Sequence, residues 1–149
     1  ANLWTEQVYN MRHAEYMTWP RGFALAEDLW SPKEKKNWNN FVSRVETHFK
    51  RFDVAQKKYA PSMYDPIFKF SKNEKGEIVV DMSTEVQDLT IYYTFDNTFP
   101  DNFYPAYTKP ATVPKDASTL KVITYRGDKV TGRLIVFPIA EMKKRAGIK

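Results

Sequence analysis

The stretch TIYYTFDN at residues 90–97 decides which class of fold the second half of the chain adopts. Thr90–Thr94 is rich in β-branched and aromatic residues and alternates along the chain, which is typical of a strand with one covered face. Asp96 and Asn97 follow it as a turn signal. A similar alternation recurs in Leu120–Tyr125. Together these strands indicate a small antiparallel β-sandwich.

Neighbouring segments extend this β-rich half, which begins at Pro61. Turn signals at Glu74–Gly76 and Arg126–Asp128 separate the predicted strands, and most of the nine prolines lie between residues 61 and 114, where loops tolerate them. The predicted strands are Ile78–Met82, Leu89–Thr94, Leu120–Tyr125 and Arg133–Ile139, with a further one starting at Phe68–Phe70.

The first half, from Val8 to about Lys58, has helical periodicity and few turn signals. Ser31–Glu34 predicts a helix start, because the serine can cap first-turn amides and the proline has no amide to leave unpaired. Met11–Trp30 also reads as helix, which Pro20 should kink or divide around Trp19. After Ser31–Glu34, apolar residues recur every three or four positions on one face, namely Trp38, Phe41, Val42, Val45, Phe49 and Phe52.

Composition narrows the classes of function. The 149 residues are 42% hydrophobic and 15% aromatic, which indicates a globular chain of one domain or a compact half with a small module. The net charge of +5 comes from scattered basic groups, so no nucleic-acid partner is expected. With no cysteine and only His13 and His48, far apart, neither a disulfide nor a metal site is expected. No apolar run is long enough for a membrane span.

Trp4 and Glu6 form a candidate binding pair in the short apolar segment that opens the chain. In an extended strand, residues two apart point to the same face. An aromatic ring can cover the C–H face of a sugar while a carboxylate accepts its hydroxyl protons. The alternative is a core tryptophan beside a solvated glutamate at a strand end.

Several pieces of the first half agree, in order and spacing, with one enzyme family. They look like the end of the catalytic barrel in family 20 glycoside hydrolases, the β-N-acetylhexosaminidases. The resemblance extends over roughly residues 1–52 and is carried by Ala1–Glu6, Glu15–Met17, Pro20-Arg21, Ala24–Glu27, Trp30–Lys33 and Trp38–Phe41.

The second half resembles the small C-terminal β-sandwich of many bacterial members of that family. The similar residues are Thr90–Asn97, Pro100, Tyr107 and Pro110, followed by the strand at Leu120–Tyr125. Asn97 stands where the family motif usually has glycine. Since asparagine tolerates a left-handed backbone better than most residues, the turn is expected to survive.

The resemblance implies an α+β fragment: the last strand and helices of a (β/α)8 barrel, followed by a small antiparallel Fn3-like β-sandwich. Residues 1–60 would be the remnant of the catalytic TIM barrel, with Ala1–Glu6 as strand 8, and residues 61–149 the accessory sandwich domain. Chemistry in such barrels lies at the carboxyl ends of the strands. Trp4 would line the pocket for a terminal N-acetylhexosamine and Glu6 would bind its outer hydroxyls. No cofactor is implied.

The family hydrolyses its substrate with retention of configuration, and the substrate's own acetamido oxygen attacks the anomeric carbon. An Asp orients the amide and a neighbouring Glu protonates the leaving group. That adjacent Asp-Glu pair does not occur in the chain, where Glu27-Asp28 has the reverse order. We therefore assign no catalytic residue and expect the chain alone to be inactive. The parent would act on terminal GlcNAc or GalNAc of glycans, with the missing N-terminal part of the barrel as partner, and would be periplasmic or extracellular.

An alternative from another class is a non-catalytic carbohydrate-binding or interdomain β-sandwich module, and a third option is a protein-binding adaptor. Seven aromatic residues in the sandwich region could form a sugar-binding face, or the core of the sandwich: Tyr92, Tyr93, Phe95, Phe99, Phe103, Tyr104 and Tyr107. The tripeptide Arg126–Asp128 spells a cell-adhesion motif, but its Gly-Asp between two strands is turn chemistry first.

Overall fold

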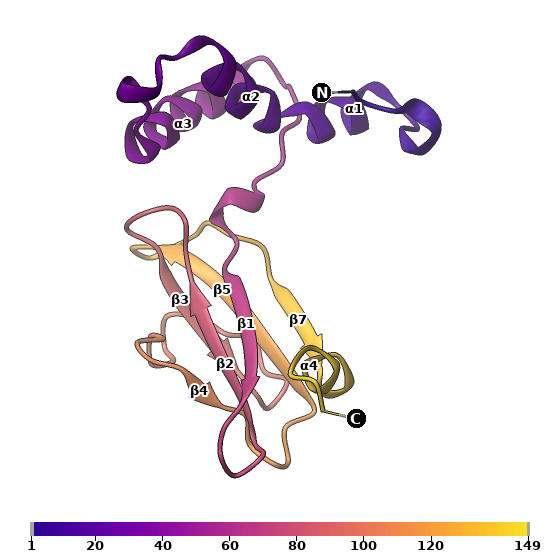
Figure 1. The fold of residues 1–149 in the computed structure, drawn as a ribbon, viewed down its shortest axis with the longest axis vertical. Coiled ribbons are helices and arrows are strands. Elements are labelled where there is room, and N and C mark those ends of the chain that lie inside the picture. Colours follow the sequence, from indigo (N-terminus) through magenta and orange to yellow (C-terminus); the bar gives the residue numbers. More distant parts are fainter. Residues whose placement is uncertain (1, 149) are drawn as a thin grey trace. The chain divides into compact units, whose positions relative to one another are not determined.

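The computed structural model describes residues 2–148. The chain divides into two compact units, Ala1–Ala60 and Pro61–Lys149, here called the helical unit and the sandwich unit (Figure 1). Their identity as a barrel remnant and an accessory domain stays a prediction. None of the described helices is both long and apolar enough to cross a membrane.

The helical unit contains α1 (Met11–Thr18), α2 (Arg21–Trp30) and α3 (Trp38–Val54). The predicted division around Trp19 is confirmed, because α1 ends at Thr18 and α2 begins directly after Pro20. The predicted apolar face of the third helix is confirmed in part, since α3 buries Val42, Val45 and Phe49 but leaves Trp38 50% exposed.

The predicted helix start at Ser31–Glu34 is wrong in position. A single 3-10 turn forms there, at Lys33–Lys35, and α3 begins only at Trp38. The side-chain oxygen of Asn37 caps α3 by accepting a hydrogen bond from the Asn40 N–H at 2.9 Å. Asparagine is as good a helix cap as serine, and Asn37 lies directly before the apolar face. The helix therefore begins after Asn37 and not after Ser31.

The strand predicted over Ala1–Glu6 is not formed by the described residues. Asn2–Trp4 has no regular structure, Thr5–Gln7 is a 3-10 turn, and Ala1 lies outside the described part. A strand exists only when its backbone pairs with a neighbour, and the segment pairs with none of the described strands. The barrel part of the predicted fold class is therefore not shown by this structure.

Polar contacts between distant residues hold the helical unit together. Glu15 on α1 accepts hydrogen bonds from the Lys57 ammonium and the Lys58 backbone N–H, both at 2.9 Å. The Ala60 N–H donates to the Trp19 carbonyl at 2.9 Å. These contacts fasten the segment that follows α3 to the region where α1 ends.

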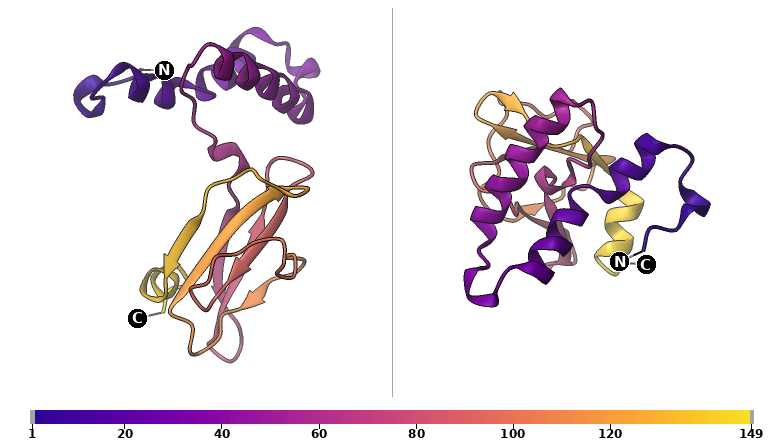
Figure 2. Two further views of the ribbon diagram at one scale, coloured as in Figure 1. Left: turned by 180° about the vertical axis from the view of Figure 1, so that it is seen from behind. Right: turned by 90° about the horizontal axis from the view of Figure 1, so that it is seen from above.

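The sandwich unit contains two antiparallel sheets, which can be followed from two further sides in Figure 2. One sheet has the order β1-β2-β4; in the other β5 pairs with β3, β6 and β7. The strand bounds are β1 (Ile67–Lys72), β2 (Ile78–Ser83), β3 (Thr90–Thr94), β4 (Ala111–Thr112), β5 (Thr119–Arg126), β6 (Lys129–Val130) and β7 (Ile135–Pro138).

All five predicted strands are found, with shifted ends. The last one was predicted over Arg133–Ile139 but begins at Ile135 and ends at Pro138, where α4 (Ile139–Arg145) begins. A proline offers no N–H to a strand partner and fits well before the first turn of a helix, so it ends the strand.

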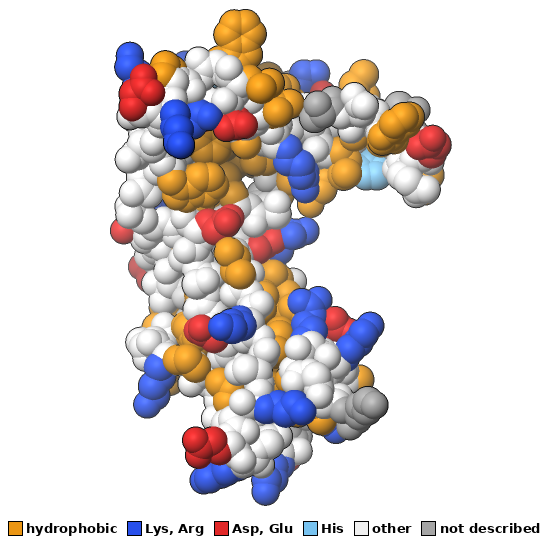
Figure 3. All heavy atoms as spheres, viewed as in Figure 1, with side chains coloured by type: hydrophobic (Ala, Val, Ile, Leu, Met, Phe, Trp, Pro, Cys, Tyr) orange, Lys and Arg blue, Asp and Glu red, His pale blue; other side chains and the backbone are white. Residues whose placement is uncertain are grey.

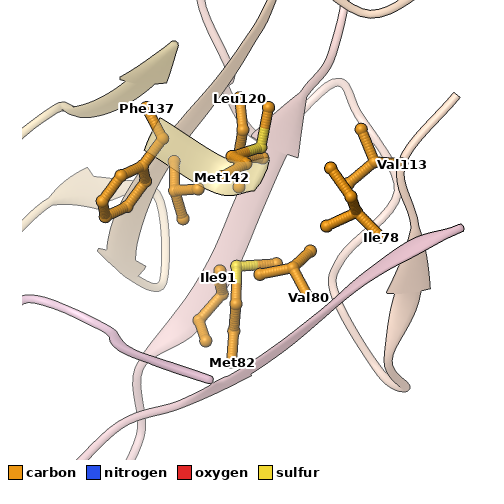
Figure 4. Close-up of a cluster of buried hydrophobic side chains, with 9 residues drawn as sticks. Ile78, Val80, Met82, Ile91, Val113, Leu120, Phe137 and Met142 are labelled. Atoms are coloured by element: carbon orange, nitrogen blue, oxygen red, sulfur yellow. The ribbon is translucent and has the colours of Figure 1, made fainter. Parts of the chain in front are cut away.

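The core of the sandwich unit lies between the two sheets (Figure 4). Ile78, Val80 and Met82 of β2 face Ile91 of β3 and Leu120 of β5. The cluster is completed by Met142 of α4 together with Val113, Val122 and Phe137. The sequence pattern thus gives a sandwich whose inner faces are apolar, as predicted.

Two turns show why particular residues occupy them. Asn97 has a φ of 68°, so the expected left-handed turn after β3 is confirmed. Gly132 lies so close to its surroundings that an added Cβ would stand 2.1 Å from the Thr124 hydroxyl and 2.8 Å from the Tyr64 carbonyl. These two groups are themselves joined by a hydrogen bond of 2.6 Å. Only a residue without a side chain leaves that bond intact.

We predict that Glu15→Gln makes the helical unit less sensitive to acid. The Lys58 N–H, followed by Lys57, lowers the pKa of Glu15 from its ordinary value of 4.5. A lowered folded-state pKa contributes stability that is complete above the unfolded value and is lost as the pH falls through the folded one. Tryptophan fluorescence reports this unit alone, since all four tryptophans lie at positions 4, 19, 30 and 38.

The measurement is acid unfolding of the original chain, the Glu15→Gln variant and a control, Glu34→Gln, in an exposed carboxylate. The variant should be less stable at neutral pH and lose less stability on acidification, whereas the control should follow the original profile. Identical acid profiles for Glu15→Gln and the original chain would contradict the assignment.

We predict that Leu120→Ala destabilises the sandwich unit by about 2 to 5 kcal/mol, because it leaves a cavity between the sheets. Leu120 is fully buried, whereas Val136 on the neighbouring β7 is 44% exposed and supplies the control, Val136→Ala. Urea unfolding followed by the amide NMR signals of β5 measures both. An equal loss of unfolding free energy in the two variants would refute the assignment of Leu120 to the core.

Candidate functional site

The predicted substrate-binding residues both lie at the surface of the helical unit. Trp4 is 71% exposed and Glu6, on the first 3-10 turn, is exposed as well. The alternative of a tryptophan in the core is not met within this chain. Because the segment is not extended, the argument that the two side chains share a face of a strand does not apply to it here. Their role in binding stays a prediction.

Apolar side chains around this segment are also uncovered. Tyr9 is 81% exposed and Met11 is 72% exposed, while α1 and α2 have no buried residue at all. On α2 the large exposed residues are Leu25, Leu29 and Trp30. The space-filling view in Figure 3 shows hydrophobic side chains at the surface over these helices. The helical unit therefore presents an apolar surface of the kind that normally packs against other protein.

Two pockets lie between α2 and α3, and both include Glu27 and Phe41. One has a volume of about 230 Å³ and is also lined by Asp28, Lys36 and Trp38. The other has a volume of about 240 Å³ and reaches Trp30, Arg44 and His48. Neither pocket is lined by Trp4 or Glu6.

The charged groups of these pockets neutralise one another. The Arg44 guanidinium donates to Glu27 at 2.7 Å and lowers the pKa of that carboxyl group. The Lys36 ammonium, 2.6 Å from Asp28, does the same for Asp28. Paired and ionised carboxylates suit a structural tie between helices, whereas a general acid needs a raised pKa. The reversed pair Glu27-Asp28 is thus engaged in holding α2 to α3 and to the linker before it.

The histidines take part in aromatic packing. His13 stacks on Tyr9 with ring centroids 6.0 Å apart, and His48 stacks on Phe23 at 4.6 Å. Within residues 2–148 there is no group of three or more metal-ligating side chains.

The seven aromatic residues singled out in the sequence of the sandwich do not all lie in its core. Tyr93, Phe95 and Tyr107 pack against the core, and the Tyr107 hydroxyl donates to Asp81 at 2.8 Å. Phe99 and Phe103 point outward, with 51% and 92% of their surface exposed. The core interpretation therefore holds for part of the set.

Gly127 and Asp128 form the turn between β5, which ends at Arg126, and β6, and Gly127 has a φ of 57°. The Arg126 guanidinium lies over the Tyr64 ring, 5.7 Å from its centroid. The arginine is thus engaged in packing within the sandwich unit, as the turn interpretation expects.

One pocket was not foreseen from the sequence. It has a volume of about 300 Å³, runs beside Tyr93–Asp96 and is completed by Tyr104 and Pro105. The dense aromatic pattern of residues 92–107 was the available signal. The path of the loop after β3, which supplies one wall, was not predictable from that pattern.

Each of the two units contains a stretch that matches a known protein family. Residues 1–33 match the family model described as "Glycosyl hydrolase family 20, catalytic domain", and residues 80–139 match the one described as "Fn3 associated". A Beta-hexosaminidase of Porphyromonas gingivalis is 28% identical over 116 residues, which are 74% of this chain and 14% of that protein. A Beta-hexosaminidase of Akkermansia muciniphila is 30% identical over 78 residues, 50% of this chain and 15% of the relative.

The chain thus spans only a small part of the length of these relatives. Its two family matches follow each other in the order of the two structural units, the helical one first and the sandwich second. These matches support the interpretation of the chain as a C-terminal fragment of a family 20 glycoside hydrolase.

Proposed function

We propose that the parent protein is a β-N-acetylhexosaminidase that releases terminal GlcNAc or GalNAc from glycans by substrate-assisted, retaining hydrolysis. The observation that carries this proposal is the pair of family matches in one chain, together with the names of the two relatives. The catalytic Asp-Glu pair would come from a part of the parent that this chain does not include.

In this proposal the chain supplies substrate contacts. The Trp4 ring covers the apolar face of the terminal sugar, and the Glu6 carboxylate accepts protons from its outer hydroxyls. The exposure of both side chains supports this role, since neither is used in the packing of the helical unit. Both contacts must strengthen as the transition state forms if they are to raise the rate.

The partner of the helical unit would be the rest of the barrel. A neighbouring strand would give the opening segment the backbone pairing that it lacks here, and would turn it into strand 8. The exposed side chains of Leu25, Leu29 and Trp30 would pack on the same body. The parent would act in the periplasm or outside the cell, as members of this family in bacteria often do.

We predict that the chain alone does not hydrolyse a chromogenic N-acetylglucosaminide. The reason is chemical: the chain contains no Asp-Glu pair that could orient the acetamido group and protonate the leaving group. The measurement is release of the chromophore over that in buffer, at enzyme concentrations high enough to detect slow turnover. Turnover well above buffer would refute this part of the proposal.

We predict that Trp4→Ala or Glu6→Gln in the full-length parent lowers kcat/KM by about tenfold or more, which corresponds to at least about 1.4 kcal/mol of transition-state binding. Glu34→Gln, a change of the same kind in an exposed carboxylate outside the opening segment, is the matched control and should leave kcat/KM unchanged. If both site variants keep the original kinetics, the adaptor alternative is favoured instead.

A further inference from the structure

The open edge of β3 forms one side of the 300 Å³ pocket beside Tyr93–Asp96. Within its sheet β3 pairs only with β5. Its other edge is followed for a short distance by the loop after β3, which returns so that the Tyr107 N–H donates to the Ile91 carbonyl at 2.8 Å. The pocket lies beyond that contact, next to Tyr93.

Tyr93 lines this pocket, and its backbone groups lie on the open edge of β3. Since the Ile91 carbonyl points away from β5, the register of the antiparallel pair makes the backbone groups two residues further on point away as well. Outside the sheet ladder, no backbone hydrogen bond from a described residue reaches Tyr93. One N–H and one C=O of a sheet edge are thus available at a pocket lined with aromatic rings.

The side chains around the pocket are fixed by one another. The Tyr104 hydroxyl lies 2.9 Å from the Thr98 hydroxyl, which donates to Asp96 at 2.5 Å. The Thr98 N–H donates to the same carboxylate at 3.1 Å. These bonds lower the pKa of Asp96, and the nearby Lys121 ammonium adds to the effect. The pocket therefore combines a preformed aromatic wall with an ionised acceptor at its rim.

We propose that this pocket binds an N-acetylhexosamine unit of a glycan, at a site separate from the Trp4 and Glu6 segment. An acetamido group carries one N–H and one C=O, which can pair with the C=O and N–H of Tyr93 as a neighbouring strand would. The sugar ring packs against Tyr104, and its hydroxyls donate to Asp96. The site does not require the parent to cleave glycans.

An extended peptide fits this edge less well. Strand addition depends on several consecutive backbone pairs. Here the Ile91 carbonyl is already occupied by Tyr107, and the turn that contains Asp96 and Asn97 ends the strand. The edge remains open at Tyr93, which is enough for one amide group.

The test is an NMR titration of the 15N-labelled 149-residue chain with N,N′-diacetylchitobiose. We expect saturable shifts at the amides of Tyr93, Phe95, Asp96 and Tyr104. Cellobiose has the same linkage without acetamido groups and should bind at least about tenfold more weakly, since a lost pair of hydrogen bonds is worth that much or more.

Two variants locate the site. Tyr104→Ala removes the aromatic wall and should weaken binding about tenfold or more. Phe103→Ala changes the neighbouring ring, which is 92% exposed and does not line the pocket, and should leave the affinity unchanged. If Tyr104→Ala fails to fold, the titrations of the unmodified chain with chitobiose and cellobiose still test the proposal.

Three results would overturn the proposal: no saturable shifts with chitobiose, equal binding of cellobiose, or shifts confined to the Trp4 and Glu6 segment. Saturable shifts of the same amides with an extended peptide, and none with the sugar, would assign the edge to strand addition instead. Loss of affinity in Phe103→Ala equal to that in Tyr104→Ala would place the binding surface outside the pocket.

Discussion

Burial of apolar side chains between β2 and β5 is the constraint on which the sandwich unit depends. Val80, Leu120 and Val122 are completely shielded from water, each from a strand that pairs with neighbours on its own sheet. Since strand side chains alternate, fixing these residues inward fixes which residues of the same strands face outward.

The helical unit has a smaller apolar core and depends more on polar contacts and partly exposed rings. Its buried apolar residues come from α3 and Ala60. The helices α1 and α2 are held by partly exposed rings and by polar contacts such as the hydrogen bonds that Glu15 accepts from Lys57 and Lys58. The ring of Phe49 stacks on Tyr59 at 3.9 Å, and that of Trp19 lies 4.4 Å from Phe23. Exposed ion pairs add little stability, so the unit leaves apolar surface for which a larger protein body is the natural cover.

Local patterns in the sequence were enough for most elements. Alternation located β3 and β5, the proline at position 20 divided α1 from α2, and Asn97 adopted the left-handed turn. What could not be predicted depends on competition or on distant partners. Ser31 and Asn37 are both good helix caps, and the sequence alone does not show which of them begins the helix. The opening segment reads as a strand but has no described partner, and the pocket beside Tyr93 depends on a contact between Ile91 and Tyr107.

The helix α4 covers part of the sandwich core, and Met142 is its buried residue. Met142 reaches the core from this short helix and is fully buried, while Arg145 of the same helix covers the Phe137 ring at 4.8 Å. A thioether that water cannot reach is also protected from oxidants, and conversion to the sulfoxide would place a polar group in the core. The rate at which peroxide modifies this methionine would therefore record how often the helix lifts from the sheets, and the modified protein would be unable to close again.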